Sequence, residues 1–502
     1  MKKIMVVFLF CIVTVGAFAQ SGYEIKIDLK NYKDNLAYLA YYQFDKTFIK
    51  DTCSAIQNGK IIFKGSSKLD NGIYALVSKQ KVLLFNFFID DETQKLELKS
   101  NAAEDFAEDV VALNSDRQND FLKYIQHLGK QNNAFMTFQK QNVLRTKQDT
   151  LSLIEKQLGF EKNIAEFERN FLDRNKGTYI GSVLNLKIER TLKDVPKAAN
   201  GRPDSIVAFN FYKNHYWDEV DFKDDAVMRN PFFFGKLKKY FDTAVSTNPD
   251  SISVALDQFL VQAQTNSLLY KSMLAYFTNT YETAPIMGYD KVFVHLADRY
   301  FKTGKAVGIY NDESVIKKVI DRAEKLRPLL IGATAQDLLM IKAQDFSKMK
   351  VMGFEDAKSS AEITKLYYKN LNSISKMYVK LSEVKAKYTI LVFWDPDCSH
   401  CQVEIPILLE SYNEMIKQNI DVKVYSVSME YEGDKYLKFI ADHKLSWINV
   451  YDGARINNTS QKYDVNTTPI IYVLDQNKII KAKRISAHQV PEIIKNLETE
   501  SK

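Results

Sequence analysis

Two cysteines three residues apart, Cys398 and Cys401, are the residues of this sequence whose type and spacing best fit a chemical reaction. A buried apolar run ending at Trp394 precedes them, and a helical pattern follows. A cysteine at the start of a helix forms a thiolate more readily, because unpaired amides and the helix dipole favour the anion. We therefore predict that Cys398 is a nucleophile and that Cys401, one turn further along, resolves a mixed disulfide.

The chain around this pair alternates between strand and helix from about residue 376 to the end. The hydrophobic pattern predicts strands at 388–394, 421–428, 469–475 and 479–485 and helices at 399–418, 435–443 and 490–497. A βαβ unit closed by two strands and a helix is typical of the thioredoxin fold. We therefore predict a C-terminal α/β thioredoxin-like domain over residues 376–502.

Several short motifs make this region similar to a known family. They are Phe393-Trp394, Glu404-Ile405-Pro406, Tyr463-Asp464-Val465-Asn466-Thr467-Thr468-Pro469 and Ile471-Tyr472-Val473-Leu474-Asp475. With the cysteine pair, the pattern resembles the TlpA-type extracytoplasmic thiol–disulfide oxidoreductases over roughly the last quarter of the chain.

This resemblance implies roles for three more residues. Many thioredoxins carry a buried acid six residues before the first cysteine, where this chain has Val392. Glu404 is then the residue expected to help proton transfer near the buried thiol, with an exposed surface glutamate as the alternative. Pro469 is expected to follow a cis peptide bond, and Thr468 to offer backbone hydrogen bonds to an extended substrate.

Two further residues are expected to tune the site. His400, between the cysteines, can stabilise a thiolate when protonated, and similarity to Cys-Pro-His-Cys oxidases would suggest a more oxidising pair. Asp395 and Asp397 act in the opposite sense by repelling the anion. A merely solvent-facing His400 stays an alternative, and Trp394 is expected to cover one side of the site.

A metal centre is not expected at the cysteine pair. Zinc sites use the same spacing, but they need a second pair of ligands. No second Cys-x-x-Cys, His-x-x-x-His or Cys/His cluster occurs in the sequence. No P-loop, Rossmann glycine signature or Gly-x-Ser-x-Gly elbow occurs either, so we expect no cofactor.

Length and charge bound the remaining possibilities. A chain of 502 residues should contain about two to four domains. The formal net charge is +7, and it falls to about +5 without Lys2 and Lys3. The basic residues are dispersed, without an arginine-rich run, so we expect no nucleic-acid partner.

The first 19 residues have the pattern of a signal peptide. Lys2 and Lys3 precede an apolar run from Ile4 to Val15, and Ala17-Phe18-Ala19 forms an A-x-A cleavage site. No later segment approaches the roughly 20 apolar residues that a membrane-spanning helix requires. We therefore expect a soluble periplasmic protein. Cys11, preceded by Phe10, lies within the apolar run, which disfavours a lipid anchor.

Residues 20–101 are predicted to form a small antiparallel β-domain. Apolar and polar residues alternate from Tyr23 to Lys30, and aromatic and β-branched residues indicate more strands at 36–42, 60–64, 73–77, 82–89 and 96–99. The order is similar to a small β-domain of unknown function that precedes thioredoxin-like domains. Cys53 is expected to line a strand rather than to form a third redox centre.

Residues 102–375 are predicted to be α-helical, with two subdomains as an option. Apolar stripes at helical spacing include Phe121, Tyr124, Ile125 and Leu128, and also Ile164, Phe167 and Phe171. The pattern breaks at residues 200–203 and at Asn230-Pro231. The aromatic segments resemble a second uncharacterised domain fused ahead of thioredoxin-like domains. Core packing is the expected role of these aromatics, and a peptide-docking groove is the alternative.

Three functions are compatible with this organisation. The favoured one is an exported oxidoreductase that exchanges the Cys398/Cys401 dithiol with protein thiols, in the reductase direction and with electrons from a membrane thiol carrier. The alternative is a binding or assembly protein that uses its thioredoxin-like domain for recognition. A peroxidase is a weaker option, because a Cys-x-x-Cys pair suits dithiol exchange better.

Overall fold

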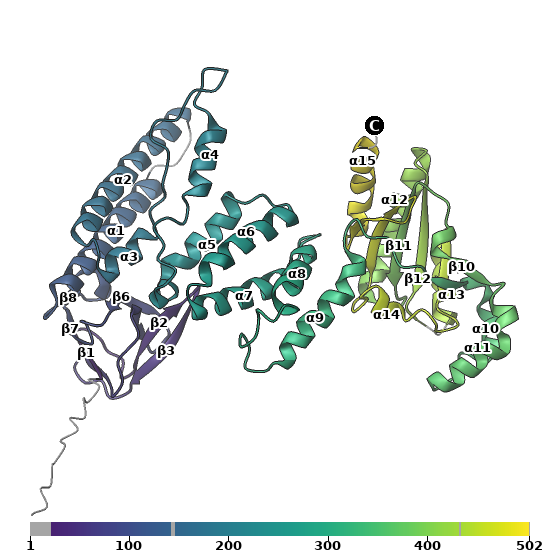
Figure 1. Cartoon of the computed structure of the whole chain (residues 1–502), viewed down its shortest axis with the longest axis horizontal. Helices are drawn as coiled ribbons and strands as arrows, with labels where there is room; N and C mark the ends of the chain where they lie inside the picture. The colour runs from purple at the N-terminus through teal and green to yellow at the C-terminus, as the bar shows by residue number, and fades with distance from the viewer. Residues whose placement is uncertain (1–21, 142–145, 431–432, 501–502) are drawn as a thin grey trace, which may run out of the picture. The chain divides into compact units, whose positions relative to one another are not determined.

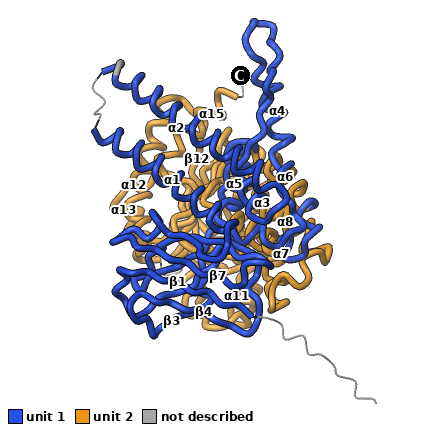
Figure 2. Tube along the Cα trace, turned by 90° about the vertical axis from the view of Figure 1, so that its left-hand side faces the viewer, with its two compact units in different colours: residues 1–247, 261–270 blue, residues 248–260, 271–502 orange. Residues whose placement is uncertain are grey.

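The computed structural model describes residues 22–141, 146–430 and 433–500, and the predicted signal peptide lies outside them. The chain divides into two compact units (Figure 2). The first comprises residues 1–247 and 261–270, and the second comprises residues 248–260 and 271–502.

Two four-stranded sheets begin the first unit. Their strand orders are β4-β1-β7-β8 and β3-β2-β5-β6. The strands are β1 (Tyr23–Leu29), β2 (Ala37–Gln43), β3 (Lys46–Cys53), β4 (Lys60–Gly65), β5 (Gly72–Ser78), β6 (Leu83–Ile89), β7 (Lys95–Ser100) and β8 (Val111–Ala112). The predicted all-β region is therefore confirmed.

Two features of these sheets differ from the prediction. Strand β1 pairs with β7 in parallel, so the region is not purely antiparallel. A hydrophobic pattern shows which face of a strand is buried but not which strand lies beside it. The sequence analysis also missed β3, whose first five residues are all exposed and therefore lack apolar alternation. Cys53, at the end of β3, is half-buried and packs against the β core, as expected of a strand residue.

Helices follow the sheets in the first unit (Figure 1). The predicted stripes meet where α1 and α2 pack together, with the Tyr124 and Phe171 ring centroids 5.1 Å apart. The helices are α1 (Asp116–Gln141), α2 (Lys147–Arg174), α3 (Tyr179–Asn185), α4 (Ser205–Asn214) and α5 (Pro231–Thr243), and α6 (Pro249–Ala263) and α7 (Ser267–Glu282) contribute residues to both units.

The predicted break at Asn230-Pro231 is the start of α5. The Asn230 side chain accepts hydrogen bonds from the backbone N–H groups of Phe232 and Phe233, at 2.9 and 3.0 Å. Such a cap followed by proline favours helix initiation. Phe233 and Tyr216 are buried, so these aromatics pack in the core as expected.

The second unit is built on a seven-stranded sheet with the order β10-β9-β13-β12-β11-β14-β15. The central β11 pairs with β12 in parallel and with β14 antiparallel, as a thioredoxin fold requires. The strands are β9 (Leu339–Lys342), β10 (Tyr378–Lys380), β11 (Tyr388–Trp394), β12 (Val422–Ser428), β13 (Ile448–Tyr451), β14 (Ile470–Asp475) and β15 (Ile480–Lys483). The α/β thioredoxin-like prediction is confirmed.

The two faces of this sheet are covered differently. Ile390, Val392 and Trp394 of β11 share one core with α12 (Ser399–Lys417), α13 (Gly433–His443) and α15 (Val490–Glu500). Leu391 and Phe393 face a second core. That second core is completed by Leu329, Ala335 and Leu338, and by Tyr463 and Val465, which follow α14 (Thr459–Lys462).

The C-terminal sheet also extends beyond the boundary predicted at residue 376. Strand β9 pairs with β13, and α10 (Phe346–Val351) and α11 (Ser360–Ile374) pack into the same core as β11. A four-residue strand at this position is too short to give a clear periodic signal. Helices α8 (Asp290–Leu296) and α9 (Ser314–Leu326) precede it within the second unit.

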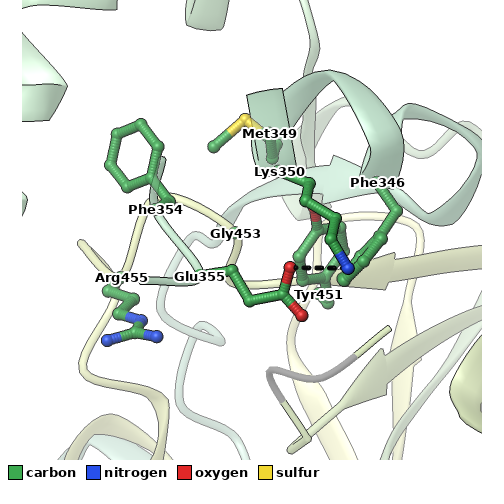
Figure 3. A pocket seen from close by; sticks show the side chains of 8 residues that line it. All are labelled: Phe346, Met349, Lys350, Phe354, Glu355, Tyr451, Gly453 and Arg455. Carbon is green, nitrogen blue, oxygen red and sulfur yellow. Dashed lines mark ion pairs between the residues drawn. The ribbon is translucent and has the colours of Figure 1, made fainter. Parts of the chain in front are cut away.

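A cavity of about 20 Å³ lies between α10 and β13 (Figure 3). Phe346, Met349 and Tyr451 line it, and Lys350 pairs with Glu355 at 3.2 Å at its rim. None of the predicted site residues lines this cavity. The cavity therefore does not belong to the cysteine pair.

Candidate redox site

Strand β11 carries the chain to the cysteine pair through a tight turn. The amide of Cys398 donates to the Asp395 carbonyl at 3.2 Å, and the amide of Asp397 donates to the Asp395 carboxylate at 2.8 Å. Gln402 closes the turn from α12 by donating to the Pro396 carbonyl at 3.1 Å. These bonds place Cys398 at the N-cap position of α12.

Cys398 is half-buried, and its Sγ atom donates to the backbone oxygen of Thr468 at 3.3 Å. Burial on its own would raise the pKa of this thiol. Hydrogen bonding from the Thr468 side chain and from the amides of Cys401 and His400 outweighs burial and lowers the pKa of Cys398 below its ordinary value. Cys398 is therefore suited to react as a thiolate.

Cys401 has the opposite environment. It lies on α12 and is fully buried in the core, and burial raises the pKa of its thiol to about 12. A thiol of this kind stays protonated at neutral pH and needs a proton acceptor before it can attack. The pair therefore combines one accessible, acidic thiol with one buried, weakly acidic thiol, which is the asymmetry that stepwise disulfide exchange requires.

The bond between Thr468 and Pro469 is cis, as predicted. It lies just before β14, and the contact between the Thr468 oxygen and the Cys398 sulfur brings this loop to the cysteine pair. The structure therefore assembles Cys398, Cys401, Thr468 and Pro469 in one place.

Glu404 is half-buried on α12, and one of its carboxylate oxygens accepts the Ala487 amide at 2.7 Å. Ala487 begins a short helical turn that leads into α15. Glu404 is therefore not a simple surface residue, because it ties the cysteine helix to the last helix. This contact joins residues 83 positions apart, so no local sequence pattern predicts it.

Trp394 does not cover the surface of the site as expected. Its side chain is completely buried, and its indole N–H donates to the Ser426 hydroxyl at 2.7 Å. Its ring packs against Tyr436 and Phe439 of α13. The side chain at the last position of β11 points into the core covered by the helices. Trp394 therefore packs beneath the cysteine turn rather than at its surface.

Several charged groups belong to the turn that carries Cys398 or contact that turn. His400 is exposed, as its alternative interpretation allowed. Carboxylate oxygens of Asp395, Asp397 and Glu430 lie within 4.8 Å of one another, and Lys435 pairs with Asp397 at 2.5 Å. No cysteine or histidine belongs to this acidic group among the described residues. The sequence did not indicate that Glu430 belongs to this acidic group, because Glu430 follows β12, the neighbouring strand of the sheet.

Comparison with known proteins agrees with this geometry. Residues 368–483 match the model of the AhpC/TSA family, and residues 156–325 match that of a domain of unknown function, DUF5106. A search of curated proteins gives no match.

Similar solved structures include a domain of a possible thiol-disulfide isomerase from Cytophaga hutchinsonii. It is 31% identical over 34% of this chain and 96% of that chain, with a TM-score of 0.27. A thioredoxin-like protein from Bacteroides caccae is 18% identical over 61% of this chain and 99% of its own, with a TM-score of 0.42. The thioredoxin domain of a Bacteroides vulgatus thiol-disulfide oxidoreductase is 20% identical over 33% and 96%, with a TM-score of 0.25.

The sheet order, the cysteine pair and the family match define the C-terminal domain as thioredoxin-like. Residues 368–483 of this domain match the AhpC/TSA family. No helix in the described part of the chain combines the length and apolar character needed to cross a bilayer.

Proposed function

We propose that this protein is an exported thiol–disulfide oxidoreductase that reduces disulfides in other proteins. The observation that carries the proposal is the placement of Cys398 at the start of α12, 3.3 Å from the Thr468 oxygen, with Cys401 buried behind it. An extended substrate chain could pair with the backbone of Thr468 and present its disulfide to Cys398.

The proposed reaction begins when the Cys398 thiolate attacks one sulfur of a substrate disulfide. A mixed disulfide forms on Cys398, and the other substrate sulfur leaves as a thiolate that takes up a proton. Cys401 then loses its proton and attacks the Cys398 sulfur, which releases the second substrate thiol. The substrate gains two electrons and two protons, and the enzyme is left with a Cys398–Cys401 disulfide.

We propose that Glu404 helps to accept the proton of Cys401 during the second step. It lies one turn beyond Cys401 on α12. The hydrogen bond from the Ala487 amide would hold the Glu404 carboxylate in a fixed position beside α12. His400, exposed next to Cys398, would stabilise the thiolate when it is protonated.

Completion of the cycle needs an external dithiol. We propose that a membrane thiol carrier supplies the electrons. We also propose that residues 1–19 direct export and that the protein acts in the periplasm. A chain in which Cys401 is replaced by serine would retain substrates as mixed disulfides on Cys398. Purification of these adducts from the periplasm and sequencing of the attached peptides would identify the substrates.

Insulin reduction in the presence of dithiothreitol tests the proposal. We expect the full chain to accelerate precipitation of the insulin B chain and Cys398→Ser to abolish the acceleration. Cys53→Ser is the matched control, because Cys53 lies in the β region of the other unit. Activity that survives Cys398→Ser would overturn the proposal.

Helix α4 supports the alternative function of a binding or assembly protein. None of its residues is buried, and it exposes Ile206, Val207 and Phe209. A variant that lacks both Cys398 and Cys401 separates the two functions. A scaffold would keep its partners after this change, whereas an oxidoreductase that binds only through mixed disulfides would lose them.

A further inference from the structure

Three basic side chains close around one buried carboxylate near the redox site. Asp464 is completely buried, and Arg322 Nη1 and Lys325 Nζ approach its Oδ1 atom at 2.6 and 3.0 Å. Arg484 Nη2 approaches the Oδ2 atom at 2.5 Å. A fully buried carboxylate is costly unless it is paired and hydrogen-bonded, and here both oxygens have partners.

Asp464 also fixes the backbone that leads to Thr468. Its φ angle is +52°, a left-handed conformation that is uncommon outside glycine. Asn466 donates to the Asp464 carboxylate at 3.0 Å, and Arg484 donates to the Asp464 carbonyl at 3.2 Å. The carboxylate therefore organises the turn that starts four residues before Thr468, whose oxygen contacts Cys398.

The two partners Arg322 and Lys325 do not come from the thioredoxin-like sheet. They lie on α9, within the stretch that matches the domain of unknown function. The chain that follows α9 adds a second restraint, because the Tyr463 hydroxyl donates to the Gln336 carbonyl and Gln336 Nε2 donates to the Lys462 carbonyl at 3.0 Å. Residues that precede the redox domain in the sequence thus contact Asp464 through Arg322 and Lys325, and contact the two residues before it through Gln336.

A second ion pair joins the same helical segment to the redox domain at Lys483, the residue before Arg484. Lys483 is nearly fully buried, and its Nζ atom binds the Asp290 carboxylate and, at 2.7 Å, the Leu329 carbonyl. Among the described residues, charged contacts thus join the helical segment to the redox domain at Asp464 and at Lys483. Only one of them leads to the loop that carries Thr468.

We propose that Asp464 is a positioning residue, through which α9 holds the Thr468–Pro469 loop against Cys398. The proposal rests on the proposed function, because it assigns the helical segment a part in that same site. It accounts for the fusion: the last helix of the otherwise uncharacterised domain would complete the substrate-binding side of the redox centre.

The test compares Asp464→Asn with the double variant Arg322→Gln/Lys325→Gln in the full chain. The readout is the pH dependence of Cys398 alkylation by iodoacetamide, followed by mass spectrometry of the Cys398 peptide. The charged groups of the cysteine turn and its contacts are Asp395, Asp397, His400, Glu430 and, through Asp397, Lys435. They are the same in all variants.

The sign of the shift separates positioning from charge. A loosened loop withdraws the Thr468 side chain, whose hydrogen bond lowers the pKa of Cys398, so both variants should move the alkylation midpoint upward by about half a pH unit. A through-space charge effect would act differently: loss of the Asp464 carboxylate would move the midpoint down, and loss of two cations would move it up. An unchanged or lowered midpoint in Asp464→Asn would overturn the proposal.

Asp290→Asn is the matched control. It breaks the ion pair between Asp290 and Lys483. If general loosening of the helical segment were the cause, Asp290→Asn would shift the alkylation midpoint as much as Asp464→Asn does. Equal shifts in the two variants would therefore also overturn the proposal. If Asp464→Asn fails to fold, Arg322→Lys takes its place, because it keeps the positive charge but loses the fixed geometry of the guanidinium group. An unchanged or lowered midpoint in Arg322→Lys would then overturn the proposal. The alkylation profile needs no turnover, so an inactive wild-type chain with the expected shifts would refute the oxidoreductase function and leave the positioning role intact.

Discussion

The Sγ atom of Cys398 lies 3.3 Å from the backbone oxygen of Thr468, a residue 70 positions later in the chain. This contact joins the start of α12 to the loop before β14. It places the reactive thiol beside the backbone that an extended substrate would use. The side chain of the same threonine also helps to lower the pKa of the Cys398 thiol.

Replacement of Thr468 by valine should therefore raise the pKa of Cys398. Valine keeps the shape and the backbone carbonyl but removes the hydroxyl that stabilises the thiolate. We expect the alkylation midpoint of Cys398 to move up by about half a pH unit. Thr467→Val, at the exposed neighbouring position, is the control and should leave the midpoint in place. Equal midpoints for wild type and Thr468→Val would show that the hydroxyl does not act on the sulfur.

Two substitutions of Glu404 should separate its structural and chemical roles. Glu404→Ala removes the acceptor of the Ala487 amide and should lower the free energy of unfolding by about 1–2 kcal/mol. Glu404→Gln keeps an acceptor oxygen, so it should cost less stability but slow the attack of Cys401 on the mixed disulfide. Urea unfolding and stopped-flow reduction of a model disulfide measure the two effects.

Glu410→Gln provides the comparison on the same helix, since Glu410 is exposed. It should change neither quantity. A Glu404→Gln chain that resolves the mixed disulfide at the wild-type rate would remove Glu404 from the reaction and leave it only the contact with Ala487.

Trp394 should contribute to stability rather than to the reactivity of the site. Trp394→Phe removes core volume and the donor to the Ser426 hydroxyl, so we expect a loss of about 1–3 kcal/mol in the free energy of unfolding. The pH profile of Cys398 alkylation should stay unchanged. Ser426→Ala should reproduce part of the stability loss. A shifted profile with intact stability would restore the redox-tuning role expected from the sequence.

The Asp464 cluster should make stability depend on pH in acid. Burial alone would raise the pKa of Asp464, but hydrogen bonds from Arg322 and Lys325 outweigh it and hold the pKa at about 2. A depressed pKa stabilises the fold above the unfolded value near 4, and this stabilisation is lost as the pH falls towards 2. The contribution at neutral pH is about 2 kcal/mol.

Urea unfolding of wild type and Asp464→Asn between pH 7 and pH 2.5 measures this contribution. The stabilities of the two chains should differ most at neutral pH and converge as the pH falls, because the asparagine amide resembles a protonated carboxyl group. A difference that stays constant over this range would contradict the ion-paired state of Asp464.

The elements of the redox domain could be predicted because their signals are local. Strand β11 is a continuous apolar run, and α12 begins at the cysteine pair, so both were placed within a residue or two of their observed ends. Strands β3 and β9 were missed because one is charged and exposed and the other has four residues.

The contacts that build the site are long-range, and the sequence pattern could not reveal them. Glu404 meets Ala487 across 83 positions, and Arg322 meets Asp464 across 142. The burial of Trp394 was missed for a related reason. Its environment is set by Ser426 and by Tyr436 and Phe439 of α13, which only the folded chain brings to the end of β11.

The most direct test of the account is a mixed disulfide between the Cys401→Ser chain and insulin. Without the resolving thiol, the attack of Cys398 on an insulin disulfide should stop at a covalent adduct, and peptide mapping should place that adduct on Cys398. The Cys398→Ser/Cys401→Ser chain should form none. An adduct located on Cys53, or no adduct under conditions in which the folded chain is fully reduced, would contradict the account.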